Sequence, residues 1–298
     1  MSDSETDALD NITNLKRYII IFGKNLPIDI DFITLICEND NLEVLKILID
    51  VYGKDLPINE KIINKFCENN NLEVLKLFKN NLYIDEWAIY WACYNDNLEM
   101  FKLLIENLKT KFSINNETLY LVCENDNLDI LKILIKKFKD EIEVSNLFAI
   151  NEACENNNIE MVKLLIKTFG DKLAVDEKAI YLACKNGNLE MVKLLIKNDF
   201  PIDERAISIA CEKNNLEIVK VLIKKYGNEL PIDKYAVEYA SKNIDIFKIL
   251  VKEFKENLPI KRALYKNCKN EQIIKIIDEL IKEYGTKIFY LSQEDIEF

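Results

Sequence analysis

The chain repeats a short pattern of polar and apolar positions. Two of its copies are DNLEMFKLLI at residues 96–105 and GNLEMVKLLI at residues 187–196. Within a copy the apolar residues follow helical spacing, as at Leu189, Val192 and Leu195. This spacing predicts an amphipathic α-helix with one apolar face and one charged face.

The residues before each copy favour a helix that starts directly after a tight turn. An asparagine, whose side-chain oxygen can accept hydrogen bonds from first-turn amides, precedes seven copies: Asn41, Asn71, Asn97, Asn127, Asn158, Asn188 and Asn215. The residue before it is Asn, Asp or Gly, which tolerate a left-handed backbone. We therefore predict a turn that leads from a shorter first helix into this second helix. The expected N-terminal caps of the first helices are Asp29, Asn59, Asp85, Asn115, Asn146, Asp176, Asp203 and Asp233.

Cysteine marks an equivalent position in each repeat. The cysteines are Cys37, Cys67, Cys93, Cys123, Cys154, Cys184, Cys211 and Cys268. Their separations are 30, 26, 30, 31, 30, 27 and 57 residues, and Ser241 divides the longest into 30 and 27. The chain therefore contains nine units of 26 to 31 residues. Residues 11–23 align with residues 41–53, so a lone second helix precedes the first unit.

This repetition predicts how the chain is organised. We expect a flexible acidic N-terminus at residues 1–10, a single solenoid at residues 11–285 and a C-terminal tail at residues 286–298. The nine repeat cores are expected around the eight cysteines and Ser241. Stacking is required because a single helix pair cannot bury its own apolar face.

Composition excludes several functions. The 298 residues carry a net charge of −11, whereas nucleic-acid binding needs a basic surface. The absence of histidine excludes Ser/His/Asp and Cys/His catalysis and nearly all catalytic zinc sites. Neither GxGxxG nor GxxxxGK[ST] occurs, and the six glycines fall at predicted helix ends and turns. We expect no cofactor, no metal and no enzymatic activity.

Hydropathy argues against a membrane protein. No apolar run approaches the roughly 18 residues that a membrane helix needs. The first ten residues are acidic, which is unlike a secretory signal or a transit peptide. We expect a soluble cytoplasmic monomer.

The cysteines are expected to be reduced structural thiols. Equivalent atoms of stacked repeats lie about 8–10 Å apart, the helix-packing distance. A disulfide needs Cα atoms within about 7 Å. The chain has no CxxC motif and no histidine to complete a zinc site. A small side chain at a helix contact explains this position, and Ser241 fits the same role.

The stretch YLACKNGNLEMVKLLI, residues 181–196, resembles an ankyrin repeat. The resemblance covers about residues 11–285 and implies an all-α, ankyrin-like helical solenoid of about nine helix-turn-helix repeats plus an N-terminal half repeat. The Thr-Pro-Leu-His motif of that family is absent. Its histidine position holds Thr34, Asn64, Tyr90, Tyr120, Asn151, Tyr181, Ser208, Glu238 and Tyr265. The units are also shorter than the family's roughly 33 residues, which predicts trimmed loops.

The resemblance also implies a concave face formed by the first helices, where ankyrin repeats bind partners. Three positions per first helix, six and two residues before the cysteine and one after it, form a variable stripe. On one stripe stand Trp87, Trp91 and Tyr94, a candidate binding hot spot. Tyr235 and Tyr239 form a second candidate. Packing between repeats is the alternative interpretation of both groups.

The same stripe carries charge. Glu38, Glu68, Glu124, Glu155 and Glu212 predict an acidic line, followed by Lys242, Arg262, Lys266 and Lys269. A partner with the opposite charge gradient would be steered into register. Ordinary solubilising charge is the alternative. On the second helices, pairs such as Glu190 and Lys193 predict a solvated outer face.

The leading functional hypothesis is a non-catalytic scaffold that binds a partner protein on this concave face. An alternative is a substrate-recruiting adaptor of a larger complex, such as a ubiquitin ligase or a signalling assembly, using residues 284–298. An enzyme would rest only on carboxylates such as Glu152 and Glu155, which surface charge explains more simply.

Overall fold

The structure is a computed structural model that describes residues 14, 16–38, 41–78, 82–109, 113, 114, 116–142, 144 and 149–289. The expected N-terminal segment 1–10, most of the tail 286–298 and the caps Asn115 and Asn146 lie outside these residues. Contacts divide the chain into unit 1, within residues 1–147, and unit 2, within residues 148–298. Each unit is described separately below.

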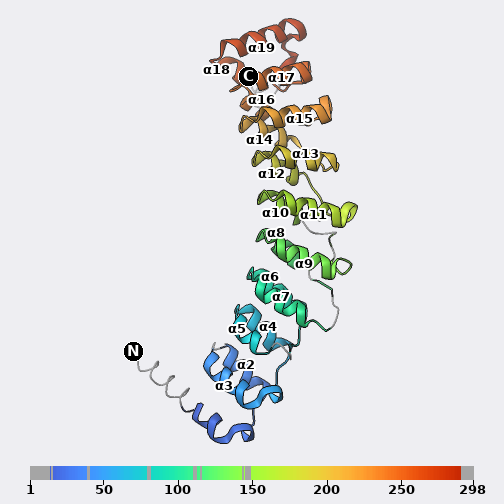
Figure 1. Ribbon diagram of the computed structural model, residues 1–298. Helices are drawn as coiled ribbons and strands as arrows, with labels where there is room; N and C mark the ends of the chain where they lie inside the picture. The colour runs from blue at the N-terminus through green and yellow to red at the C-terminus, as the bar shows by residue number, and fades with distance from the viewer. Residues whose placement is uncertain are drawn as a thin grey trace, which may run out of the picture. The chain divides into compact units, whose positions relative to one another are not determined.

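Unit 1 contains four helix pairs, preceded by a helical segment at residues 16–22. The pairs are α2 (Ile30–Glu38) and α3 (Leu42–Tyr52), α4 (Glu60–Glu68) and α5 (Leu72–Leu77), α6 (Glu86–Tyr94) and α7 (Leu98–Asn107), and α8 (Asn116–Glu124) and α9 (Leu128–Phe138). Successive first helices contact one another, and so do successive second helices. The pairs therefore stack in chain order (Figure 1).

Unit 2 contains five helix pairs that follow one another in chain order (Figure 1). They are α10 (Ala149–Glu155) and α11 (Ile159–Phe169), α12 (Lys178–Lys185) and α13 (Leu189–Lys197), α14 (Glu204–Glu212) and α15 (Leu216–Tyr226), α16 (Lys234–Ala240) and α17 (Ile244–Phe254), and α18 (Arg262–Asn267) and α19 (Glu271–Tyr284). The short 3₁₀ turns are Gly23–Asn25, Gly53–Asp55, Gly170–Lys172, Gly227–Glu229, Lys255–Asn257 and Gly285–Ile288.

The all-α class is confirmed for the part of the chain that the structure describes. Its only β features are isolated bridges, Ile114 with Ile142 and Ile260 with Phe289. The nine helix pairs and the preceding helical segment match the expected repeats and half repeat. A single solenoid running continuously through residues 11–285 stays a prediction.

The interior of each stack combines one face of each helix. In the sixth repeat of the chain, Ala179, Ile180 and Ala183 of α12 are fully buried, as are Met191 and Val192 of α13. Burying one aliphatic side chain stabilises a fold by roughly 1.5–3 kcal/mol. The small residues of the first helix allow the two helices to approach closely. The apolar stripe predicted from helical spacing is therefore the core.

The predicted capping of the second helices is confirmed. In α13, Asn188 Oδ1 accepts a hydrogen bond from the Met191 amide at 3.0 Å. The preceding residue has positive φ wherever it is described: Asn70, Asp96, Asp126, Asn157, Gly187 and Asn214. The first helix α12 begins one residue later than its cap position predicts, although the Asp176 carboxylate still accepts from the Lys178 amide at 3.1 Å.

Asparagine side chains link neighbouring turns, which the sequence did not predict. The amide of the residue two after the cysteine donates to the cysteine carbonyl of the preceding repeat: Asn95 to Cys67 at 2.8 Å, Asn125 to Cys93 at 3.0 Å and Asn186 to Cys154 at 2.9 Å. Four cap asparagines, Asn97, Asn127, Asn188 and Asn243, also donate to the side-chain oxygen of the preceding repeat's left-handed residue, as Asn188 does to Asn157 at 2.7 Å. That second bond explains why Asn or Asp replaces glycine there.

A further set of polar links involves residues at the position where the resembled family has histidine. Asn64 donates to Asp85 at 3.0 Å and Asn151 to Asp176 at 2.9 Å. Ser208 donates to Asp233 at 2.6 Å. In each case the aspartate also accepts from amides at the start of the next first helix. The bonds that the missing Thr-Pro-Leu-His motif would supply are thus partly replaced.

All eight cysteines are thiols rather than disulfides, as expected. Seven are buried, and Cys268 is half-buried. Burial raises the pKa of the Cys154 and Cys211 thiols to about 12, and it raises the pKa of Cys67, Cys93 and Cys184 as well. These groups are protonated packing residues of the core.

The end of α17 has the backbone conformation of a glycine without being one. α3, α11, α15 and α19 end at a glycine with positive φ. α17 ends instead at Lys255, with φ 48° and ψ −122°, close to the 54° and −119° of Gly53. A side chain in this region is strained, because the Cβ atom meets neighbouring backbone.

Candidate functional site

Four aromatic side chains of α6 form a continuous cluster on the surface of unit 1. We call Trp87, Tyr90, Trp91 and Tyr94 the α6 aromatic cluster. The Tyr90 ring centre lies 5.6 Å from Trp87, 5.2 Å from Trp91 and 6.2 Å from Tyr94. The Trp91 and Tyr94 centres are 5.4 Å apart with perpendicular planes. Trp87 and Tyr94 are 45% and 54% exposed, and the two central rings are half-buried.

Helical spacing explains this grouping. The four residues stand at i, i+3, i+4 and i+7, which places them on one side of a helix. The opposite side of α6 is the core face, where Ala88, Ile89, Ala92 and Cys93 are buried. The predicted patch of Trp87, Trp91 and Tyr94 is therefore assembled as a unit. Tyr90 was not among the predicted residues, because it occupies the family's histidine position.

The edge of the cluster that faces α8 is acidic. The pKa of Tyr90 is raised first by burial and then by the negative charge of Glu117 and by Tyr94. Glu117 is exposed on α8. Glu124, at the end of the same helix, is also exposed and accepts a hydrogen bond from the Tyr120 hydroxyl at 3.3 Å. Both glutamates supply negative charge beside half-buried tyrosine rings, Glu117 beside Tyr90 and Glu124 beside Tyr120.

The second aromatic group lies on α16 in unit 2 and is already in contact with cations. Tyr235 is 48% exposed, and Tyr239 is half-buried. The Lys234 and Lys261 ammonium groups lie 5.4 Å and 5.1 Å from the Tyr235 ring centre. Lys242, which is exposed, lies 5.4 Å from the Tyr239 ring centre. These rings offer a partner less uncovered surface than those of α6.

Glu155 is exposed but lies within an ion-pair network. Its carboxylate is 3.5 Å from the Lys185 ammonium and 3.9 Å from that of Lys178. Lys178 also lies 4.0 Å from Glu152. The acidic line expected from the sequence is therefore largely neutralised on α10, which weakens Glu155 as a binding residue.

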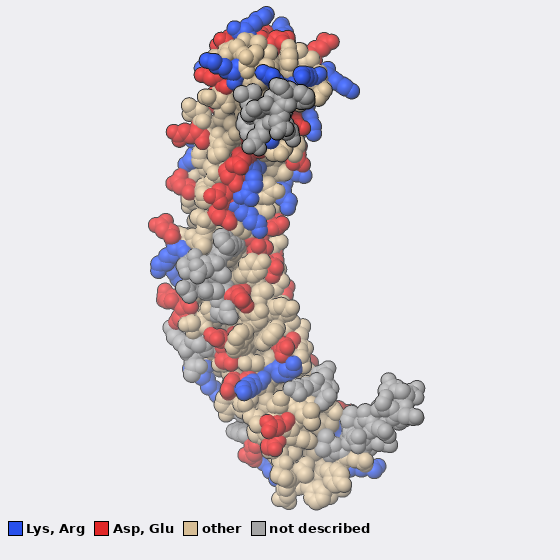
Figure 2. Space-filling view, turned by 180° about the vertical axis from the view of Figure 1, so that it is seen from behind, with Lys and Arg blue, Asp and Glu red and all other residues tan. Residues whose placement is uncertain are grey.

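The second-helix faces carry the expected Glu–Lys pairs. Glu190 and Lys193 are 2.8 Å apart, as are Glu217 and Lys220. All are solvent-exposed, and such pairs contribute about 0–1 kcal/mol each. The second helices therefore present a solvated face. In places in Figure 2 acidic and basic side chains lie next to one another.

The described residues form neither a metal site nor a membrane-spanning helix. Among the residues that the structure describes, no three His, Cys, Asp or Glu side chains are grouped so that they could hold a metal ion. Within the same residues, no helix combines the length and apolar character needed to cross a bilayer.

The predicted site residues thus fall into separate groups. Trp87, Trp91 and Tyr94 form one surface with Tyr90. Glu124 lies on α8, the first helix of the next repeat. Tyr235 and Tyr239 lie on α16, and Lys242 lies in the turn after it. Glu155 ends α10 and is tied to α12 by its lysine contacts.

Comparison with known proteins gives a consistent family assignment. A search of curated proteins returned no match to this sequence. The family described as "Ankyrin repeats (3 copies)" matches residues 33–118, 89–176, 150–234 and 180–262. These overlapping matches span more than half of the chain and coincide with the stacked helix pairs. The chain therefore belongs to the ankyrin-repeat family.

Proposed function

We propose that this protein binds a partner protein through the exposed faces of its first helices, with the α6 aromatic cluster as the main anchor. Ankyrin repeats are generally protein–protein interaction modules. The observation that carries the proposal is the exposure of Trp87 and Tyr94 on a helix whose other side is core. Large exposed aromatic side chains are uncommon on a surface that meets only water.

The geometry suits a binding hot spot. Trp and Tyr bury a large area and have few rotatable bonds, so they lose little entropy on binding. Contacts among the four rings hold Trp87 and Tyr94 before any partner arrives. Such preorganisation reduces the ordering cost of association. Glu117 adds negative charge at one edge, which favours a partner surface that carries a positive group.

The proposed role is that of a scaffold without catalysis of its own. Ankyrin repeats are typically non-catalytic. We further propose a cytoplasmic monomer that lies outside membranes and does not bind nucleic acid; the net charge of −11 supports the last of these. The adaptor alternative would need the C-terminal tail, of which only residues 286–289 are described.

The test is partner capture with the double variant Trp87→Ala/Tyr94→Ala. Binding partners are first isolated from the native cell on the unmodified chain and then titrated against purified variants. We expect the double variant to bind at least about tenfold more weakly, because truncating each hot-spot residue costs roughly 1–2 kcal/mol or more.

The matched control is Tyr18→Ala/Phe22→Ala. It removes another pair of stacked exposed aromatic rings from unit 1, with centres 5.9 Å apart. We expect this control to retain partner affinity. Equal affinity of the α6 variant and the unmodified chain would contradict the proposal.

A further inference from the structure

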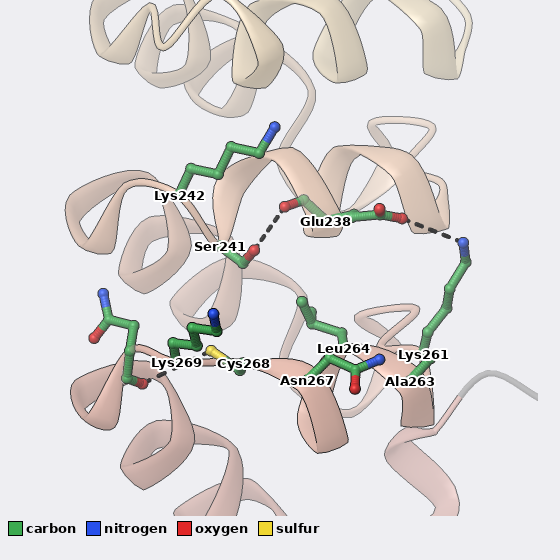
Figure 3. A pocket seen from close by; sticks show the side chains of 10 residues that line it. Glu238, Ser241, Lys242, Lys261, Ala263, Leu264, Asn267, Cys268 and Lys269 are labelled. Atoms are coloured by element: carbon green, nitrogen blue, oxygen red, sulfur yellow. Dashed lines mark hydrogen bonds and ion pairs between the residues drawn. The ribbon is translucent and has the colours of Figure 1, made fainter.

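A basic notch lies between the turns of the last two repeats of unit 2. The cavity has a volume of about 570 Å³. Its lining residues are Glu238, Ser241, Lys242, Lys261, Ala263, Leu264, Asn267, Cys268, Lys269 and Asn270. Figure 3 shows these side chains on both sides of the gap between α16 and α18. We call this cavity the C-terminal notch.

The notch exists because the turns here are shorter. In the seven earlier repeats the cap asparagine follows the cysteine by four residues. In three of them an asparagine two residues after the cysteine donates to the preceding cysteine carbonyl: Asn95, Asn125 and Asn186. In the last two repeats the caps Asn243 and Asn270 follow Ser241 and Cys268 by only two residues. These turns are therefore two residues shorter, and the space between them stays open.

The charge of the notch is opposite to that of the whole protein. Three lysines and one glutamate line it, whereas the chain has a net charge of −11. Lys261 is held by Glu238, with its ammonium 3.2 Å from the carboxylate. Neither Lys242 nor Lys269 forms an ion pair with any described residue. Figure 2 shows both basic and acidic side chains at this end of unit 2.

The two unneutralised lysines come from neighbouring turns. Lys242 follows α16, and Lys269 follows α18; both are exposed. In Figure 3 Lys269 lies beside the Cys268 sulfur, and Lys242 extends from the turn on the other side of the notch, with its ammonium group pointing away from Lys269. A lysine side chain is a point charge on a flexible four-carbon stem, so both ammonium groups can reach one bound anion.

The rest of the lining favours a carboxylate side chain over a compact inorganic anion. Ala263 and Leu264 form an apolar part of the wall, which suits the methylene groups of glutamate. Asn267 supplies a side-chain amide at the rim. We propose that the C-terminal notch binds glutamate side chains of an acidic segment in a partner protein. This inference rests on the proposed function, since it names the chemistry of a second contact with that partner.

The experiment uses the full chain and a fluorescein-labelled octaglutamate peptide. Its affinity is measured by anisotropy at low and high salt. We expect the variant Lys242→Gln/Lys269→Gln to bind about tenfold more weakly at low salt. Salt should weaken binding to the unmodified chain, because exposed charges are screened beyond about 10 Å at 0.1 M.

The matched control is Lys193→Gln/Lys220→Gln. It changes the net charge equally but on second helices, where both lysines pair with glutamates. We expect it to bind octaglutamate within about twofold of the unmodified chain. If both double variants lose affinity equally, binding reflects net charge alone and the notch assignment is wrong.

Cys268 provides an independent readout of where the peptide binds. It is the half-buried cysteine in the notch lining, whereas the other seven are buried. We expect octaglutamate to slow alkylation of Cys268 by iodoacetamide at least threefold at saturation, and octalysine to have no effect. An unchanged alkylation rate would overturn the proposal, as would protection by inorganic phosphate but not by the peptide.

A chain ending at residue 289 tests this protein's own acidic residues 290–298 as the occupant. We expect the shortened chain to bind octaglutamate as the full chain does. If peptide binding appears only after this deletion, the occupant is intramolecular and the partner proposal is overturned. If the unmodified chain does not bind octaglutamate, capture of a partner protein through the α6 aromatic cluster is unaffected. The two proposals therefore fail independently.

Discussion

The side-chain amide of Asn186 donates a hydrogen bond of 2.9 Å to the carbonyl oxygen of Cys154, which lies 32 residues earlier. That carbonyl belongs to the last turn of α10 and also accepts a hydrogen bond from the Asn157 backbone amide at 3.1 Å. The Asn186 amide also lies 3.1 Å from the carbonyl of Glu155. One asparagine side chain thus links the end of the preceding first helix to the next repeat.

We predict that Asn186→Ala destabilises the junction between these repeats by about 1 kcal/mol, the net value of a lost hydrogen bond. Native-state hydrogen exchange should show faster exchange in α10–α13 than in α16–α19, because coupling in a repeat array is between neighbours. Asn228→Ala, in the exposed loop after α15, is the control and should change stability by less than about 0.5 kcal/mol. Equal effects of both changes would show that the inter-repeat bond is unimportant.

The sequence predicted what depends on neighbours along the chain. Asn188 as a cap, Gly187 in a left-handed turn and Cys184 in the core all follow from local spacing, and all are confirmed. The bond from Asn186 to Cys154 could not be predicted in this way. The recurring asparagine two residues after the cysteine was visible, but its acceptor is defined only by how adjacent repeats stack.

We predict that Lys255→Gly stabilises the protein by about 0.5–1 kcal/mol. Lys255 has φ 48° and ψ −122°, a conformation that costs a side-chain-bearing residue more than it costs glycine. Lys248→Gly is expected to destabilise the protein, because this exposed lysine lies inside α17 and glycine lowers helix stability by about 1 kcal/mol. Urea unfolding of the two variants checks the pair; destabilisation by both would refute the strain at Lys255.

We predict that buried thiols make the fold sensitive to alkaline pH. Burial raises the pKa of Cys154 from its ordinary value of 9.0 to about 12. Above pH 9 the unfolded chain releases this proton while the folded chain keeps it, so the free energy of unfolding falls as pH rises. The loss is about 1.4 kcal/mol per pH unit for each such thiol until the folded pKa is reached.

Cys154→Ala isolates this contribution. The variant loses packing contacts at pH 8, but its stability should fall less steeply between pH 9 and pH 11 than that of the unmodified chain. Urea midpoints measured at four pH values give both slopes. Parallel slopes would mean that the Cys154 thiol titrates alike in the folded and unfolded states.

The candidate site was only partly predictable from the sequence, because some of its contacts depend on how neighbouring repeats stack. The i, i+4, i+7 spacing was enough to group Trp87, Trp91 and Tyr94. Tyr90, which contacts all three rings, lies at the position where the ankyrin family has histidine, outside the three stripe positions of the first helix. Glu155 matched the acidic line, but its pairing with Lys185 depends on the spacing of α10 and α12.

Site-specific photo-crosslinking tests the central claim, that the first helices bind a partner protein, most directly. A benzophenone amino acid is placed in the native cell either at Tyr94 on α6 or at Glu99 on α7, which are both exposed in the same repeat. The account predicts a defined adduct with another protein from position 94 and little from position 99. Adducts of equal yield from both positions, or from position 99 alone, would contradict it.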